Sequence, residues 1–364
     1  VIGTNAFMNR ITIRKFKAIS FYVLSWVFSC LLLTAFYFYY DPNLSLKFSF
    51  LLAVQYALLL GLSHGIYDVI VLEDNKDHRS IWIALLIRSS YFLTAIAVNV
   101  TICVFIWSLY DFGNMISEES FALVATVFAS PITHLLILYS FIMGYLITFV
   151  RSVHKKFGTR VFINTLLGKY QDPTEEERVF MLVDLKNSTN IAEELGHFKY
   201  SEFLRDYYRY LSNCCEENHG EIYQIAGDGA YLTWSLRASI KNPRPVLCFY
   251  DLMICLNNTR RNFLRKYSVA PSCKAAIHCG KVIVSEVGNF GSEIAYHGDV
   301  INTTARLETL CSKIGQDLIC SECFIEKVNL KDYYPQKQGT FELKGKKKTI
   351  SVYSLHFSLD KENT

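Results

Sequence analysis

The pattern of hydrophobic and polar positions divides the chain into two unlike parts. Apolar residues dominate positions 19–150, whereas short apolar runs alternate with polar segments from position 179 onward. About 20 mostly apolar residues are enough to cross a bilayer. Four segments meet this condition: 18–40, 48–72, 81–109 and 121–150. We therefore expect an all-α bundle of four membrane-spanning helices, followed by a domain outside the membrane.

Basic residues flank the first and the last of these segments. Cytoplasmic loops carry an excess of Lys and Arg, so this distribution predicts that both termini lie in the cytoplasm of a multi-pass protein of the cell (inner) membrane. No small-residue cleavage site follows the first segment, so a removable signal peptide is not expected. The basic residues are Arg10, Arg14, Lys15 and Lys17 before the first segment, and Arg151, Lys155, Lys156 and Arg160 after the fourth.

A few polar side chains lie inside the apolar segments, where they are costly and invite a functional interpretation. They are His64, with Asp68 one turn further on, Arg88 and His134. Two histidines on different helices would suit a haem or a metal ion between them. The alternative is that these residues hydrogen-bond to neighbouring helices. Pro131 is expected to kink the fourth helix.

The second part alternates strand and helix patterns. Strands are expected at 179–185, 221–226, 230–234, 273–279, 281–287, 317–320, 340–343 and 350–355, and helices at 188–218, 243–266 and 299–313. Ser188 and Thr189 are expected to cap the first helix, which breaks near Gly196. This order predicts an α+β domain with helices packed on a mixed sheet. The expected division is an N-terminal segment 1–17, a membrane domain 18–150, a connector 151–178, a soluble domain 179–358 and a tail 359–364.

Composition adds little to this division. The net charge of +4 is too small to indicate a nucleic-acid partner, and a first residue of Val is typical of a fragment or a processed chain. The eleven cysteines show no disulfide framework. Cys320 and Cys323 form a lone Cys-x-x-Cys motif, a weak indication of a metal site. We expect reduced thiols packed as small apolar groups.

Two carboxylates stand at the ends of neighbouring predicted strands. Asp184 closes an apolar run, and Asp228 lies in a Gly-Asp-Gly turn 44 residues later. Each alone is explained by a helix cap or a hairpin turn. Together they would hold divalent cations beside a triphosphate, because Mg²⁺ prefers a few carboxylates completed by phosphate oxygens. Two cations so placed would activate an attacking oxygen and stabilise the leaving one.

Two further groups suit phosphate chemistry. Asn302 and Arg306 are four residues apart in a predicted helix, so they project from one face. They would hold a ribose oxygen and a developing phosphoryl charge, or they would be the polar face of a surface helix. Lys344-Gly345-Lys346 begins a cationic loop that would meet phosphates or would be a solvated turn.

The ordered motifs resemble the class III nucleotidyl cyclases, the adenylyl and guanylyl cyclase family. They are FMLVDL at 180–185 with ST at 188–189, AGDG at 226–229, GDVINTTARLE at 298–308 and FELKGK at 341–346. The resemblance covers roughly residues 179–356. It implies homodimers with active sites at the interface, where Asp184 and Asp228 of one subunit bind two Mg²⁺ or Mn²⁺ ions.

The resemblance also implies roles for the remaining residues. Backbone amides of residues 185–189, with Leu185, Ser188 and Thr189, would bind the nucleotide phosphates. Asn302 and Arg306 of the other subunit would orient the ribose and stabilise the α-phosphate, and Lys344 or Lys346 would neutralise the leaving pyrophosphate. The family's first base-selecting position corresponds to Gln224, and the second to Ala295 if no gap intervenes or to Glu293 if one does. At the ungapped positions the residues match neither the adenylyl nor the guanylyl pattern.

The resemblance implies that the ribose 3′-hydroxyl of ATP attacks the α-phosphorus. The products would be 3′,5′-cyclic AMP and pyrophosphate, and the membrane domain would regulate the reaction. Two alternatives remain open: a guanylate cyclase that makes cyclic GMP, and a membrane receptor or scaffold with a degenerate cyclase domain. A transporter receives little support, because no pair of broken helices recurs in matching halves.

Overall fold

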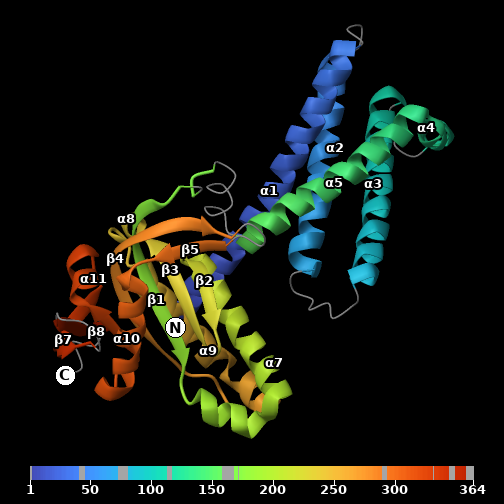
Figure 1. The fold of residues 1–364 in the computed structure, drawn as a ribbon. Helices are drawn as coiled ribbons and strands as arrows, with labels where there is room; N and C mark the ends of the chain where they lie inside the picture. The colour runs from blue at the N-terminus through green and yellow to red at the C-terminus, as the bar shows by residue number, and fades with distance from the viewer. Residues whose placement is uncertain are drawn as a thin grey trace. The chain divides into compact units, whose positions relative to one another are not determined.

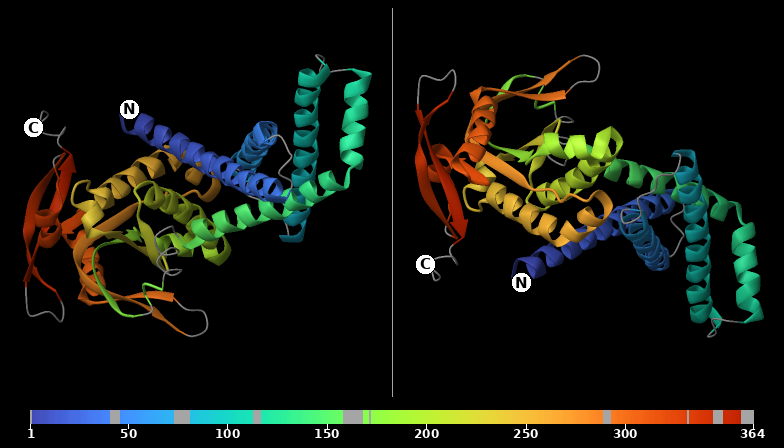
Figure 2. Two further views of the ribbon diagram at one scale, coloured as in Figure 1. Left: turned by 90° about the horizontal axis from the view of Figure 1, so that it is seen from above. Right: turned by 90° about the horizontal axis from the view of Figure 1, so that it is seen from below.

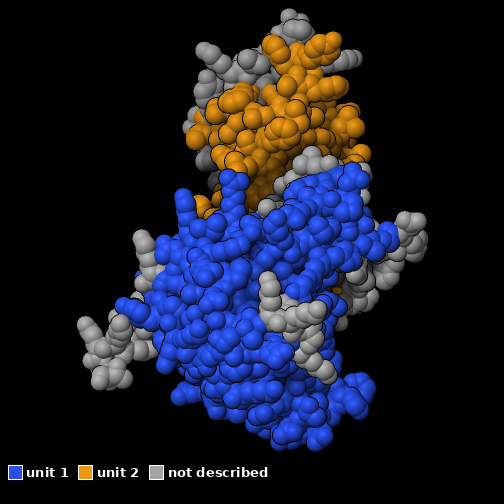
Figure 3. Space-filling view, turned by 60° about the vertical axis from the view of Figure 1, so that its left-hand side comes forward, with its two compact units in different colours: residues 1–8, 160–364 blue, residues 9–159 orange. Residues whose placement is uncertain are grey.

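A computed structural model describes residues 2–40, 46–72, 81–112, 117–157, 168–170, 172–288, 293–330, 332–343 and 349–357. The chain forms two compact units, one of residues 9–159 and one of residues 160–364 together with 1–8 (Figure 3). The middle of the predicted connector, residues 158–167, lies outside the described residues. Each unit is considered by itself below.

The first unit consists of long helices: α1 (Ile2–Tyr40), α2 (Leu46–Ile66), α3 (Ile81–Phe112), α4 (Glu118–Ala129) and α5 (Pro131–Phe157). A π-helical turn, Tyr67–Leu72, continues α2. Within the described residues, four stretches are long and apolar enough to cross a membrane: Lys15–Phe36, Phe50–Ile70, Leu86–Leu109 and Pro131–Val153. The prediction of four apolar membrane-type helices is therefore confirmed.

The fourth stretch begins later than predicted. Instead of a kinked helix over 121–150, the chain has two helices separated at Ser130, whose backbone is extended. The cause is Pro131, because the residue before a proline is pushed out of the α region and proline itself donates no hydrogen bond.

Small residues and buried polar groups hold this bundle together. Gly61 lets α1 and α2 approach so closely that a Cβ there would lie 2.7 Å from the Cα of Val23. His64 links two helices: its Nδ1 accepts from Trp26 Nε1 of α1 at 3.1 Å, and its Nε2 lies 3.0 Å from Thr148 Oγ1 of α5. Asp68 lies 2.7 Å from Arg88 and 3.6 Å from Arg151.

These contacts contradict the hypothesis that His64 and His134 share a haem or a metal ion. His64 contacts Thr148 on α5, and His134 stands fourteen residues earlier on the same helix and is exposed. At 1.5 Å of rise per residue the two positions on α5 are about 21 Å apart. His64 and Arg88 instead link helices, as the alternative interpretation predicts.

The second unit is the expected α+β domain. Its strands are β1 (Thr174–Leu185), β2 (Glu221–Ala226), β3 (Gly229–Ser235), β4 (Cys273–Val287), β5 (Glu293–His297), β6 (Leu318–Ser321), β7 (Tyr333–Glu342) and β8 (Thr349–Phe357). Its helices are α7 (Ser188–Glu217), α8 (Leu236–Ser239), α9 (Arg244–Tyr267), α10 (Asp299–Ile314) and α11 (Glu322–Lys327). The mixed sheet has the order β2-β3-β1-β4-β6-β8-β7, with β5 paired to β4 (Figure 1).

Helices cover both faces of this sheet. The helices α7 and α9 lie side by side (Figures 1 and 2), and Met253 of α9 contacts Cys273 of β4. Ala276, three residues further along β4, packs against Leu307 of α10. Because successive residues of a strand face opposite ways, α9 and α10 lie on opposite faces.

The sheet differs from the predicted strands in four places: β5 was not predicted, β7 begins at Tyr333 instead of residue 340, and β4 and β1 have other bounds. The residues 273–287 form one strand rather than two, because Gly280 continues the ladder opposite Arg178. Strand β1 begins at Thr174, five residues earlier than expected. Its acidic start faces two lysines, since Lys281 of β4 lies 2.8 Å from Glu175 and Lys327 of α11 lies 2.9 Å from Glu177.

Candidate active site

Asp184, near the end of β1, and Asp228, in the turn between β2 and β3, lie side by side. Strands β1 and β3 are antiparallel, and Asp184 is directly opposite Gly229, the residue after Asp228. A Cβ on Gly229 would lie 3.3 Å from Asp184 Oδ1. Asp228 also raises the pKa of Asp184 by charge repulsion, which requires the two carboxylates to be close. The structure thus brings these two predicted site residues together.

The turn that carries Asp228 is held in place by a tyrosine. Gly227 has a φ of +63°, a conformation that favours glycine. The hydroxyl of Tyr208, on α7, donates to the carbonyl of Gly227 at 2.9 Å and to that of Gly229 at 3.2 Å. Both carboxylates raise the pKa of this hydroxyl after the larger effect of its burial, so Tyr208 stands near both. No local sequence pattern had indicated Tyr208 as a site residue.

A lysine and a glutamate complete the charges around Asp184. Lys274 is its partner on β4, with Nζ 3.6 Å from Asp184 Oδ2 and 2.9 Å from Glu308 Oε1 on α10. Ser312 accepts a third contact at 3.0 Å. Burial raises the pKa of Asp184 to about 6, with Glu308 and Asp228 adding to the shift and Lys274 opposing it. The site therefore has an excess of negative charge in a partly buried place.

A polar cleft of about 450 Å³ opens beside Asp184. It is lined by residues 184–189, Lys274, Cys311 and Ser312 near the end of α10, and residues 315–317 that follow this helix. Helix α7 begins at Ser188, and Asn187 before it has a φ of +55° and makes no side-chain cap. Ser188 and Thr189 are thus the first helical residues rather than the predicted caps. The uncapped amide groups at this end suit an anion.

Helix α10 presents two different faces. Asn302 is exposed and Arg306 is half-buried, whereas Glu308 is buried against Lys274. Glu308 stands two residues after Arg306, about 200° further around the helix. Asn302 and Arg306 therefore share a face, as predicted, but that face points away from the carboxylates of their own chain.

The predicted base-selecting positions lie in β2 and β5, each next to a tyrosine. Gln224 is exposed next to a bulge in β2, and Ala295 is half-buried in β5. Their neighbours Tyr223 and Tyr296 are in edge contact, with ring centroids 5.0 Å apart. Alanine offers no hydrogen-bonding side chain, so a polar contact to a base would fall to Gln224. The predicted phosphate ligands Lys344 and Lys346 lie outside the described residues.

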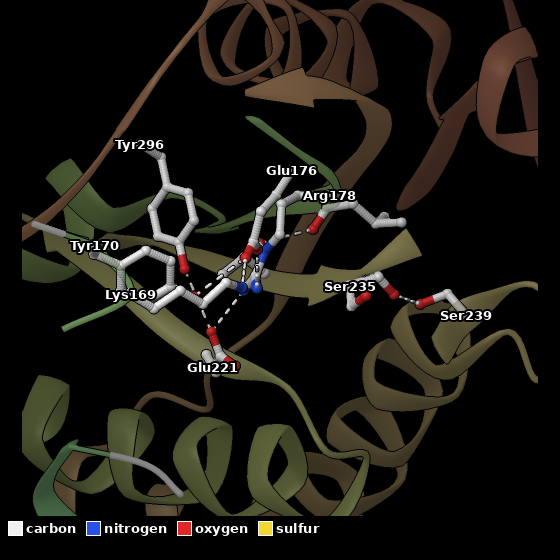
Figure 4. A network of polar contacts seen from close by, with 10 residues as sticks. Lys169, Tyr170, Glu176, Arg178, Glu221, Ser235, Ser239 and Tyr296 are labelled. Carbon is white, nitrogen blue, oxygen red and sulfur yellow. Dashed lines mark hydrogen bonds and ion pairs between the residues drawn. The ribbon is translucent and has the colours of Figure 1, made fainter. Parts of the chain in front are cut away.

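A buried arginine ties β1, β2 and β5 together (Figure 4). Arg178 is 1% exposed and lies 2.5 Å from Glu221 and 3.4 Å from Glu176, with its guanidinium over the ring of Tyr296. Buried charges need such partners. Because β5 leads into α10 and β2 into the Asp228 turn, this network sets the position of both elements.

The carboxylates fit a divalent cation only in part. Within the described residues, no three His, Cys, Asp or Glu side chains gather as a complete metal site. Two adjacent carboxylates with excess negative charge nevertheless match the protein share of a Mg²⁺ site, whose other ligands are phosphate oxygens and water. The residues therefore fit metal ions that arrive with a phosphorylated substrate.

Comparisons with known proteins agree with this chemistry. The family model for the adenylate and guanylate cyclase catalytic domain matches residues 171–357. Adenylate cyclase 2 of Rhizobium meliloti (strain 1021) is 30% identical over 210 residues, which are 57% of this chain and 58% of that protein. The chain thus spans less than two thirds of this curated relative.

Two solved structures resemble the chain, and the first of them shows the same fold. A bacterial light-regulated adenylyl cyclase has a TM-score of 0.50 at 16% identity, covering 59% of this chain and 62% of that one. The adenylyl cyclase CyaB from P. aeruginosa has a TM-score of 0.46 at 16% identity, covering 51% of this chain and 97% of that one.

Proposed function

The chain belongs to the adenylate and guanylate cyclase family, whose catalytic-domain model covers slightly more than half of it, and from this premise we propose that it is a membrane-bound adenylate cyclase. The observation that carries the proposal is the convergence of Asp184 and Asp228 beside a polar cleft. The substrate would be ATP, and the products would be 3′,5′-cyclic AMP and pyrophosphate.

Members of this family use divalent metal ions. Asp184 and Asp228 would hold two Mg²⁺ or Mn²⁺ ions, which acidify the ribose 3′-hydroxyl and neutralise the triphosphate when bound. Burial raises the pKa of Asp184, and the charges of Glu308 and Asp228 raise it further; bound cations would relieve that repulsion. Tyr208 fixes the loop on which Asp228 stands, so the spacing of the two carboxylates is set before substrate arrives.

The triphosphate would lie along the cleft. Residues 185–189 line this cleft up to the start of α7, and Lys274 borders the same space. The Lys186 amide already donates to the carbonyl of Ser272 at 2.8 Å, so the phosphates would be bound by the other amides of this segment. A lysine that faces both a carboxylate and this cleft would turn toward a β- or γ-phosphate when the metal ions take over its role beside Asp184. Lys344 and Lys346 would add positive charge to the leaving pyrophosphate.

A complete site would require two chains. Asn302 and Arg306 face away from their own carboxylates, so they would act on the nucleotide bound by the partner subunit. There Arg306 would stabilise charge on the α-phosphate through its fork of donors, and Asn302 would orient the ribose. Two equivalent chains related by a two-fold axis would form two such sites.

The choice of ATP is supported by the named activity of the Rhizobium meliloti relative. The side chain at position 224 leaves GTP as a second candidate, because the Gln224 amide both donates and accepts hydrogen bonds and can pair with either purine. Purified full-length protein should form cyclic AMP from ATP in the presence of Mn²⁺. Cyclic GMP from GTP as the sole product would overturn the choice of substrate, and neither product would overturn the proposal.

The membrane helices would place the cyclase domain in the cytoplasm and regulate it. Asp68 contacts α3 through Arg88 and α5 through Arg151, and α5 is the helix that leads toward the catalytic domain. We expect Asp68→Asn to change the cyclase activity of the full-length protein, because it removes the contacts of Asp68 to both α3 and α5. Unchanged activity in this variant would show that Asp68 does not act on the catalytic domain.

A further inference from the structure

Two cysteines from distant parts of the chain meet at one end of the catalytic domain. The Sγ atoms of Cys279, on β4, and Cys323, on α11, are 3.0 Å apart. Cys323 Sγ also lies 3.3 Å from the carbonyl oxygen of Cys279. The sequence motif suggested a pair of Cys320 with Cys323, but Cys320 is fully buried in β6 and the partner of Cys323 is Cys279.

The strand register allows a covalent link between these cysteines. Strands β4 and β6 are parallel, and Ile277 is opposite Cys320. Two residues further along each chain, Cys279 comes opposite position 322, next to Cys323. Cys323 itself is the second residue of α11, which follows β6 directly, and its sulfur is already 3.0 Å from that of Cys279, compared with a bond length of about 2.05 Å in a disulfide. A small movement would therefore bring the two sulfur atoms to bonding distance.

Solvent exposure distinguishes Cys323 from the other thiols. Of the eleven cysteines, all of which are described, only Cys103 and Cys323 are not buried. Cys103 lies in a candidate membrane span. The hydrogen bond from Cys279 lowers the pKa of Cys323 to about 7, and the nearby Lys327 ammonium lowers it further against the effect of burial. The thiolate is the reactive form of cysteine.

We propose that Cys279 and Cys323 form a redox-active dithiol site that takes hydroperoxides as its substrate. The Cys323 thiolate attacks one peroxide oxygen, the O–O bond breaks, and Cys323 becomes a sulfenic acid while the other oxygen leaves as hydroxide. The Cys279 sulfur then attacks the Cys323 sulfur, its proton joins the departing hydroxyl as water, and a disulfide forms. In sum, two thiols and one hydrogen peroxide give one disulfide and two water molecules.

The link would reach the catalytic machinery through Gly280. This residue follows Cys279, and a Cβ on it would lie 2.8 Å from Val300 Cγ2 in the first turn of α10. The backbone of β4 therefore touches the helix that carries Asn302 and Arg306. Movement of Cys279 toward Cys323 would shift that contact and lower the cyclase activity, a consequence that rests on the proposed function.

The test is to treat reduced full-length protein in detergent with hydrogen peroxide and to measure its intact mass and its disulfide-linked peptides. We expect a loss of two hydrogens, a single Cys279–Cys323 link, and reversal by dithiothreitol. Cys279→Ser should give no link but a sulfenic acid on Cys323 that dimedone traps. Cys323→Ser should give neither product. Cys320→Ser is the matched control and should still form the link.

These readouts do not depend on cyclase activity, so the redox proposal and the proposed function can fail separately. A link that involves Cys320, or wild-type protein whose mass does not change under peroxide, would overturn the dithiol site. If the link forms but cyclic AMP production is the same in oxidised and reduced protein, the connection to α10 through Gly280 is wrong.

Discussion

Lys274 faces Asp184 across neighbouring strands, with its ammonium nitrogen 3.6 Å from the carboxylate while it also pairs with Glu308 at 2.9 Å. The lysine thus stands between a carboxylate of the proposed metal site and a helix whose other face carries Asn302 and Arg306. Before substrate binds, this lysine is the counter-ion of the partly buried acidic group. After binding, it is placed to contact a phosphate.

Lys274→Gln tests this double role. The variant removes a charged contact to the triphosphate, worth about 1.5–3 kcal/mol, so the KM for the ATP–Mn²⁺ complex should rise about tenfold or more. It also leaves Glu308 without its cation, so the melting temperature in the absence of nucleotide should fall. Steady-state kinetics and thermal unfolding measure the two effects.

Lys281→Gln is the matched control for this variant. Lys281 lies on the same strand and pairs with Glu175, but its side chain is 65% exposed. Exposed pairs contribute only about 0–1 kcal/mol. Kinetics should therefore be unchanged. An unchanged KM in Lys274→Gln would show that Lys274 does not contact the triphosphate.

Local patterns predicted Asp184 and Asp228 but could not predict Lys274 or Tyr208. A strand that ends in Asp and a Gly-Asp-Gly turn are short-range signals. The hairpin that contains the turn determines which residues lie near the two aspartates. The pairing of β4 with β1 joins residues almost a hundred positions apart, and nothing in the local pattern specifies that Asp184 comes opposite Lys274. The contact of Tyr208 with the turn likewise depends on how α7 packs.

The fold was predictable where periodicity was strong. The apolar helices and the Asn302–Arg306 face required only the spacing of residues. The thiol pair shows the opposite case, because the Cys-x-x-Cys spacing, a weak indication of a metal site, gave no sign that Cys323 lies beside Cys279. A six-residue helix, α11, turns Cys323 toward β4, and so short an element has too few residues to show a period.

Tyr208→Phe tests whether the tyrosine positions Asp228. The variant removes hydrogen bonds to the carbonyls of Gly227 and Gly229 while it keeps the ring. Each bond contributes about 0.5–1.5 kcal/mol, so stability should fall only slightly. Activity should fall about tenfold, because a looser turn moves one carboxylate relative to the other. Raising the Mn²⁺ concentration should recover part of the lost activity.

The control for this variant is Tyr210→Phe. Tyr210 lies on α7, as Tyr208 does, and its ring contacts Phe263 of α9. That substitution should leave both activity and metal dependence unchanged. Equal metal dependence in Tyr208→Phe and wild-type protein would show that the hydroxyl does not act through Asp228.

The oxidation of the dithiol should depend on pH with a defined sign. A pKa of about 7 for Cys323 means that the reactive thiolate increases as pH rises through this value. Roughly a tenth of the thiol is ionised at pH 6 and roughly nine-tenths at pH 8, so disulfide formation should be about ninefold faster at pH 8. Mass spectrometry of quenched samples gives the rates.

Cys279→Ala provides the control for the pH profile. It removes the hydrogen bond that is the largest cause of the lowered pKa, so the sulfenic acid on Cys323 should form with a profile displaced to higher pH. A profile that is the same in both proteins would show that Cys279 does not activate Cys323.

The shared active site predicts rescue between two inactive variants. Asp184→Asn should abolish the metal site, and Arg306→Ala should abolish stabilisation of the α-phosphate, so each homodimer should lose at least about a hundredfold in activity. When the two variants are co-expressed, about half of the dimers are mixed, and each mixed dimer contains one intact site. Activity should therefore return to about a quarter of the wild-type value, one intact site in every four.

Co-expression of Asp184→Asn with Asp228→Asn is the decisive control for this rescue. Both substitutions affect the carboxylates of their own chain, so neither site of a mixed dimer is intact, and no activity should return. Rescue requires that the Asn302–Arg306 face act on the partner, because that face is turned about 200° from Glu308 and the carboxylates behind it. If the first pair shows no more activity than the second, Arg306 acts within its own chain, and the orientation of α10 relative to Asp184 must change before catalysis.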